Sequence, residues 1–222
     1  MIIEYEIPKL NDKTNPFIGY WGKKIFIGQL SDDQIVNALA DTYVRLVFSA
    51  TDDYNHATQS LKDFFSESSG PIRISSLQRA IGRFESCITN MHRAVMAFVR
   101  LRRRATLPPT GRQSLNERKP IFATDAISDQ LRNVRNEIQH IEEALAKGKI
   151  PHGLHHSIMP DGHEVPFDDG VNPNQTKKTF DRLKIGHREL QFSDLSQWLD
   201  EMIQYADILQ QQLPSTRTSA KA

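Results

Sequence analysis

Apolar residues recur at helical spacing in three long segments of the chain. Between residues 74 and 104 they alternate three and four positions apart, which predicts one long amphipathic helix. The same alternation predicts a helix over about 125–147 and a final helix that starts at Ser193–Asp194 and ends before Pro214. The stripe residues are Ile74, Leu77, Ile81, Phe84, Ile88, Met91, Val95, Phe98, Ile127, Leu131, Val134, Ile138, Ile141, Leu145, Leu195, Leu199, Met202, Ala206, Leu209 and Leu213.

The N-terminal third gives less regular patterns. Ser31 and the two aspartates after it favour a helix start, and residues 31–66 are compatible with a helix that breaks near 51–53. Residues 2–7 and 24–28 are short runs rich in isoleucine and aromatic residues, and Asn15–Pro16 and Gly22 break the chain between them, so we expect two short strands that form a small ribbon.

The segment between the last two long helices differs in composition. Residues 150–180 are rich in proline, glycine, aspartate and histidine, which is typical of a loop. Residues 183–192 favour a tight β-hairpin directly before the final helix.

Several long helices, each with one apolar face, bury those faces most economically against one another. The sequence therefore predicts a mainly α fold, an antiparallel bundle of four to five helices with short N-terminal strands and a small hairpin before the last helix. We expect a strand-containing segment over 1–30 packed on the bundle, and a helical domain over 31–213 with an excursion at about 150–192. A disordered tail is expected over 214–222.

Length and composition indicate the class of protein and its cellular compartment. A chain of 222 residues with 38% hydrophobic content suits a soluble globular domain. No apolar run approaches the roughly 18 residues of a membrane span, and the start lacks the pattern of a secretion signal. The single cysteine, Cys87, excludes an internal disulfide and falls beside an apolar stripe, so we expect a packing role in a cytoplasmic protein.

The helix predicted over 125–147 carries an unusual set of polar residues. Asn136 and His140 are four positions apart and share the face opposite the apolar stripe, while Arg135 projects from its flank. We therefore expect His140 to be exposed. Glu137 is expected to be a surface charge, and Glu143 to face water rather than pair with His140.

The motif Arg-Asn-x-x-x-His, formed by Arg135, Asn136 and His140 on a late helix of a helical bundle, resembles the HEPN superfamily (higher eukaryotes and prokaryotes nucleotide-binding). The resemblance covers about 31–147 and the last helix. Many members are metal-independent endoribonucleases of defence and toxin–antitoxin systems that act as dimers, with both motifs lining one cleft. The resemblance thus implies these three catalytic residues, a homodimer, no cofactor and a neutralising protein partner. Other members have lost cleavage and only bind nucleotides or partners.

The chemistry of these side chains suits RNA cleavage by attack of the 2′-hydroxyl on the adjacent phosphate. An imidazole with an ordinary pKa of about 6.5 exchanges protons at neutral pH. Arg135 presents a charged fork to phosphate oxygens, and Asn136 can orient the imidazole or donate to substrate. We expect a metal-independent endoribonuclease. The alternative is a catalytically inactive module that uses the same face to bind nucleotide, RNA or a protein.

Positive charge is concentrated in residues 71–120, which contain 11 Lys or Arg and two acids, so this segment carries +9 and the remainder −8. Such a field attracts RNA phosphates, although acids elsewhere in the bundle could pair with the same face. The arginines expected to bind RNA are Arg79, Arg83, Arg93, Arg100, Arg102, Arg103 and Arg104.

Four histidines lie in the 150–180 segment, close to Asp161, Asp168 and Asp169. Imidazoles and carboxylates can bind zinc, but their spacing matches no defined site, so we expect an exposed polar loop and no metal. These histidines are His152, His155, His156 and His163.

Overall fold

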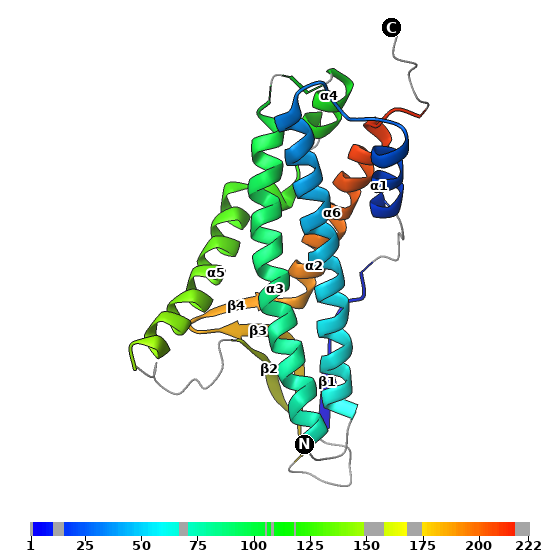
Figure 1. The fold of residues 1–222 in the computed structure, drawn as a ribbon. Coiled ribbons are helices and arrows are strands. Elements are labelled where there is room, and N and C mark those ends of the chain that lie inside the picture. The colour runs from blue at the N-terminus through cyan, green and yellow to red at the C-terminus, as the bar shows by residue number, and fades with distance from the viewer. Residues whose placement is uncertain are drawn as a thin grey trace, which may run out of the picture. The chain divides into compact units, whose positions relative to one another are not determined.

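The computed structural model describes residues 2–10, 16–66, 71–104, 106–107, 109–117, 119–148, 158–167 and 175–215, and for 71–73, 141–142 and 144–145 the backbone alone. Within these residues the protein is mainly helical with a small mixed sheet (Figure 1), which confirms the predicted class. None of the described helices combines the length and the apolar composition that a membrane crossing requires.

Proline and aspartate residues define several helix starts. Pro16, Pro71 and Pro109 each occupy the first helical position, where the missing N–H costs nothing. Asp33 precedes another helix, and its Oδ1 accepts the N–H of Ile35 at 2.8 Å, which caps that end. The helices are α1 (Pro16–Phe26), α2 (Gln34–Ser66), α3 (Pro71–Arg102), α4 (Pro109–Glu117), the short 3-10 helix η1 (Ile121–Ala123), α5 (Asp125–Ala146) and α6 (Phe192–Gln212).

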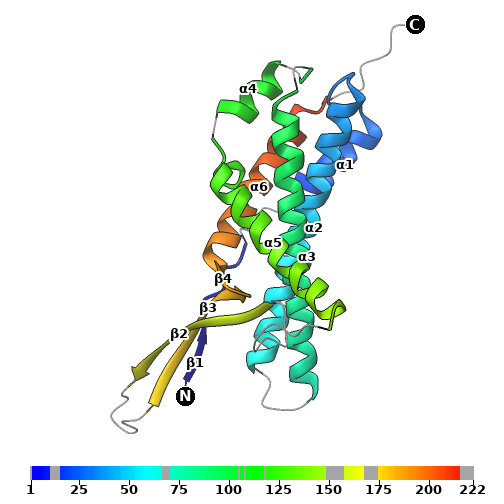
Figure 2. The ribbon, with the colours of Figure 1, turned by 90° about the vertical axis from the view of Figure 1, so that its left-hand side faces the viewer.

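One strand organises the sheet. The strands are β1 (Ile2–Tyr5), β2 (Ile158–Phe167), β3 (Gln175–Ile185) and β4 (Arg188–Gln191). β3 pairs in antiparallel register with β2 on one side, and on the other with β1 in parallel and with β4 in antiparallel register (Figure 2). The N-terminal strand is therefore held by a segment more than 170 residues later in the chain.

The chain divides into two compact units, each built from three segments. One comprises Met1–Leu10, Asp53–Ile88 and Arg132–Gln197, and so includes the sheet. The other comprises Asn11–Asp52, Thr89–Leu131 and Trp198–Ala222. We call them the sheet unit and the helical unit and describe each by itself.

Aromatic contacts form part of the core of the sheet unit. The rings of Tyr54 and Phe84 meet edge to face at 6.3 Å, and Phe84 lies 5.5 Å from Phe192 at the start of α6. The Tyr54 hydroxyl donates to the carbonyl oxygen of Pro8 at 2.7 Å. This bond ties the segment after β1 to α2.

The helical unit has its own aromatic cluster. Phe98 of α3 lies 5.0 Å from Phe122 and 5.0 Å from Tyr205 of α6. Tyr43 of α2 packs 5.2 Å from Phe98, and its hydroxyl donates to the carbonyl oxygen of Met202 at 2.9 Å. All four rings are buried, and burial of their apolar area stabilises this unit.

The predicted strand over 24–28 is wrong, and so is the ribbon. Residues up to Phe26 belong to α1, while β1 pairs with β3 instead. The Tyr20 hydroxyl and the Lys24 ammonium both donate to Asp41 of α2 at 2.8 Å. These contacts fix a helix whose isoleucines and phenylalanine had suggested a strand.

The predicted loop over 150–180 is also wrong where the structure describes it, because β2 and most of β3 lie there. The two prolines of this segment that the structure describes, Pro160 and Pro166, occur in β2. Among the described strands β2 pairs with β3 alone, so it is an edge strand that tolerates proline. A side chain at Gly162 would overlap the carbonyl oxygen of Thr179, so the glycine permits close strand pairing. The hairpin over 183–192 is confirmed by β3 and β4.

The long helices agree with their stripes, with local differences. The described stripe residues of α6 are all buried, whereas Ile74 of α3 is exposed. No break interrupts α2 at 51–53, and α6 starts at Phe192, so Ser193 and Asp194 occupy its first turn. The short helix α4 was not predicted, because it is only nine residues long and starts within a Pro-Pro-Thr-Gly stretch that is typical of a helix end.

Candidate functional site

The Arg-Asn-x-x-x-His motif lies in the sheet-unit part of α5. Val134 and Ile138 are buried on one face of the helix, whereas 72% of the His140 side chain is exposed. Arg135 and Asn136 are half-buried. The prediction that His140 is not a core histidine is confirmed, and all three motif residues retain solvent contact.

His140 has a carboxylate neighbour one turn later. Its Nδ1 lies 3.6 Å from Oε2 of Glu143, whose side chain is 62% exposed. The expectation that Glu143 faces water without pairing is therefore wrong in part, since its carboxylate is both solvent-exposed and within ion-pair distance. The contact is longer than a hydrogen bond and well hydrated, so it guides the imidazole only weakly.

Glu137, inside the motif, contacts the β3–β4 turn. Gly186 in this turn has φ +58°, and a side chain placed there would overlap the Glu137 carboxylate. Figure 1 shows the turn beside α5. Glu137 is thus more than the surface charge expected from the sequence, because its side chain packs against the hairpin next to Arg135 and Asn136.

The arginines predicted to bind RNA are divided between the two units. Arg79 and Arg83 lie in the sheet unit, while the other five lie in the helical unit. All are exposed except Arg102, which is half-buried. Arg102 lies over the ring of Phe98 at 5.6 Å and donates from Nε to Oδ1 of Asn116 at 3.1 Å, so this arginine has packing contacts of its own.

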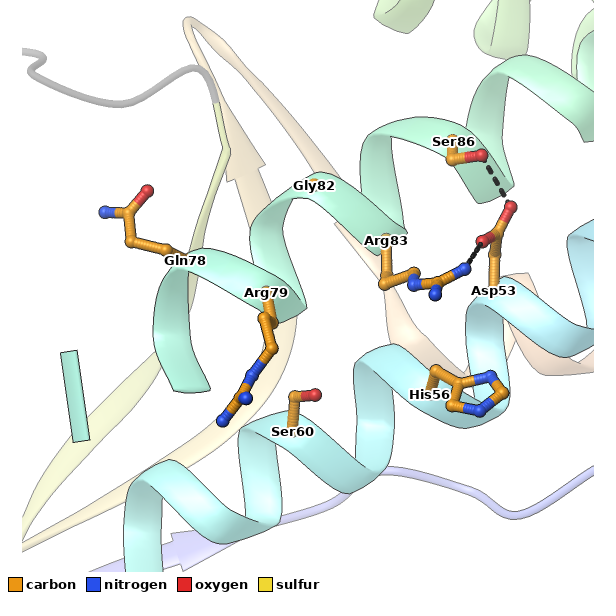
Figure 3. Close-up of a pocket in the computed structure, with 8 residues that line it drawn as sticks. All are labelled: Asp53, His56, Ser60, Gln78, Arg79, Gly82, Arg83 and Ser86. Atoms are coloured by element: carbon orange, nitrogen blue, oxygen red, sulfur yellow. Dashed lines mark hydrogen bonds and ion pairs between the residues drawn. The ribbon is translucent and has the colours of Figure 1, made fainter. Parts of the chain in front are cut away.

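A cavity of about 440 Å³ in the sheet unit contains the first two of these arginines (Figure 3). It is lined only by residues of α2 and α3. Arg79 reaches from α3 towards α2, whereas Gln78 points away from the rest (Figure 3). The lining residues are Asp53, His56, Ser60, Gln78, Arg79, Gly82, Arg83 and Ser86.

The Asp53 carboxylate of this cavity is nearly buried, with a side chain only 7% exposed. Its Oδ1 accepts from Nη1 of Arg83 at 2.8 Å, and its Oδ2 accepts from the hydroxyl of Ser86 at 2.5 Å. The carboxylate therefore fixes a guanidinium whose own side chain is 50% exposed.

His163 and Asp161 of the proposed polar loop lie on β2. Nδ1 of His163 is 3.2 Å from Oδ2 of Asp181, and the guanidinium of Arg182 also binds this carboxylate, at 2.7 Å. The hydrogen bond from Arg182 lowers the pKa of Asp181, against a smaller opposing effect of burial, and His163 lowers it further. Within the described residues no three potential ligands gather around a metal position, and His152, His155, His156, Asp168 and Asp169 lie outside them.

Cys87 is fully buried on α3, and burial raises the pKa of its thiol well above the ordinary value, with the charge of Asp53 adding to this effect. The thiol therefore stays protonated near neutral pH. The expected packing role of Cys87 is confirmed, since the thiolate is the nucleophilic form.

Comparisons with models of protein families, with curated proteins and with solved structures find no match for this chain. The resemblance to HEPN proteins therefore rests on the motif and its helical setting.

Sequence reasoning missed most of the cavity, including Asp53, Ser86 and Gly82. Asp53 and Arg83 are 30 positions apart on different helices, and their pairing leaves no local signature. One signal was present, since a glycine in the middle of a long helix is unfavourable and calls for a reason.

Proposed function

We propose that this protein is a metal-independent endoribonuclease of HEPN type, acting as a homodimer in a defence or toxin–antitoxin setting. The observation that carries the proposal is the exposure of His140, on the same helix as half-buried Arg135 and Asn136 and opposite buried Val134 and Ile138. A histidine meant for packing would lie on the buried face. The same proposal places the protein in the cytoplasm and includes a protein partner that neutralises it.

The proposed reaction moves two protons. His140 accepts the proton of an RNA 2′-hydroxyl as its oxygen attacks the adjacent phosphorus. The bond from phosphorus to the 5′-oxygen then breaks, and that oxygen receives a proton from a second imidazole. Arg135 stabilises the charge on the phosphorane-like transition state, and Asn136 orients the imidazole or the phosphate.

A homodimer gives the second imidazole a source, because His140 of the other copy can act as the acid. It also removes a geometric difficulty within one chain. Arg135 and His140 are five positions apart, which separates them by about 140° around a helix at roughly 100° per residue. Arg135 of one copy and His140 of the other can grip one phosphate if two α5 helices pair.

The test is incubation of purified full-length protein with single-stranded RNA in excess chelator. We expect cleavage, and we expect His140→Ala to reduce its rate by at least about 100-fold, as removal of an acid–base group does. Gln139→Ala, an equally exposed change at the neighbouring position, is the matched control and should keep the rate within about twofold of the unmodified protein.

Two outcomes contradict the enzyme. RNA binding without cleavage, weakened by Arg135→Ala, would identify the inactive binding module instead. If neither binding nor cleavage depends on Arg135 or His140, then the motif has no role in RNA recognition.

A further inference from the structure

The α2–α3 cavity of the sheet unit has a lining without any apolar side chain. Typical organic-ligand sites are lined mainly by apolar and aromatic residues, with a few polar groups. Here seven lining residues are polar and the eighth is Gly82. With His56 as the only ring in the lining, the side chains offer a ligand hydrogen-bonding groups rather than aromatic faces.

The charge of the lining favours an anion. Arg79 and Arg83 are four positions apart on α3, a spacing that brings two like charges together and is unfavourable unless something neutralises them. Asp53 neutralises Arg83 at 2.8 Å. Arg79 donates from Nη2 to the hydroxyl of Ser76 at 3.1 Å, and among the described residues no carboxylate forms an ion pair with it.

Gly82 lies between these arginines and leaves the cavity wall open. A Cβ at this position would meet nothing within 4 Å. Glycine weakens a helix interior compared with alanine, so a glycine with ample space around it is not explained by packing. In Figure 3 the backbone of α3 at Gly82 runs between the positions of Arg79 and Arg83, and both arginine side chains extend towards α2.

We propose that this cavity binds a sugar phosphate. Forked guanidiniums match the several oxygens of a phosphate better than they match a single acceptor. The hydroxyl of Ser60 adds a polar contact, whereas the hydroxyl of Ser86 already donates to Asp53. A cavity of about 440 Å³ has room beyond one phosphate, and its polar lining suits the hydroxyls of a sugar rather than a nucleobase.

The sugar-phosphate group that binds here can come from two sources, a free sugar phosphate or the sugar–phosphate backbone of RNA. The proposal goes beyond RNA cleavage, because the cavity uses no residue of α5. Binding at the cavity is therefore unaffected by His140→Ala, and loss of one activity leaves the other intact.

Calorimetric titration of the full chain with ribose 5-phosphate, inorganic phosphate and sulfate tests the proposal. We expect ribose 5-phosphate to bind more tightly than sulfate, and Arg79→Gln to weaken it about tenfold through loss of a charge-assisted contact. Arg45→Gln, at an exposed arginine of α2 outside the cavity, is the control and leaves the affinity unchanged.

A second pair of variants tests access. Gly82→Leu fills the open wall and weakens binding about as much as Arg79→Gln, whereas Gly82→Ala adds one methyl group and keeps most of the affinity. Both substitutions favour the helix, so loss of binding in the leucine variant does not reflect unfolding. Circular dichroism of each variant checks this.

The source is identified by adding 2′-O-methyl RNA, which this mechanism cannot cleave. Displacement of ribose 5-phosphate supports the proposal with RNA as the source, and retention supports it with a free sugar phosphate. The proposal is overturned if ribose 5-phosphate fails to bind at millimolar concentration, if it binds no better than sulfate, or if Arg79→Gln and Gly82→Leu leave its affinity unchanged.

Discussion

The Asp53 carboxylate provides a quantitative prediction about the sheet unit. Asp53→Ala removes the acceptor of two hydrogen bonds, one from Arg83 at 2.8 Å and one from Ser86 at 2.5 Å. Both donors lie on α3 and Asp53 lies on α2, so the substitution removes a polar connection between these two helices.

The expected loss of stability follows from the exposure of the partners. A hydrogen bond to a charged group contributes about 1.5–3 kcal/mol, and the Ser86 bond to a carboxylate only 7% exposed should count in full. The Arg83 side chain is 50% exposed, so solvent screening reduces its share to about 0.5–1 kcal/mol. We expect Asp53→Ala to lower the free energy of unfolding by about 2–4 kcal/mol.

Thermal unfolding followed by far-ultraviolet circular dichroism measures this loss. For a chain of this length about 2–4 kcal/mol corresponds to a fall in Tm of roughly 5–15 °C. The matched control is Asp63→Ala, which makes the same change on α2 but removes only an exposed hydrogen bond from Gln59. Equal Tm values for the two variants would refute the assignment of Asp53 as a buried, doubly bonded acceptor.

Two further predictions concern the sheet. Gly162→Ala should lower stability by about 1–3 kcal/mol, since its methyl group would overlap the Thr179 carbonyl, whereas Gly22→Ala on α1 meets open space and should not destabilise. Tm values of the two variants compare them directly. The lowered pKa of Asp181 stabilises the fold above the ordinary aspartate pKa of about 3.9, and this contribution is lost as pH falls through the folded-state pKa. Asp181→Asn should therefore be less stable than the unmodified protein at pH 7, with the difference shrinking below about pH 4; a difference independent of pH would contradict this.

The long helices were predictable because each carries an apolar stripe with an unbroken period. The stripe residues Leu131, Val134 and Ile138 of α5 are buried as that period requires, while Ile127 near the start of the helix is half-buried. The strands of the 158–185 segment were not predictable in this way. Proline and glycine normally interrupt strands, and only the edge position of β2 and the close approach of Gly162 to β3 make them compatible.

The candidate site on α5 was predictable in part for the same reason, since periodicity places His140 opposite the buried face. The contact of Glu137 with the Gly186 turn was not predictable, because it joins a helix to a hairpin about 50 residues later. The cavity residues were not predictable either, because they too are far apart in the sequence. Asp53 and Arg83 come together only when α2 and α3 pack, and the chain between them gives no sign of that pairing.

The ends of the RNA products test the central claim most directly. With excess chelator present, RNA cut by the proposed attack of the 2′-hydroxyl carries a 2′,3′-cyclic phosphate on one fragment and a 5′-hydroxyl on the other. Mass spectrometry of the fragments identifies both groups. We predict these ends from the unmodified protein and intact RNA from His140→Ala, whereas fragments ending in a 3′-hydroxyl, or equal cleavage by both proteins, would contradict the account.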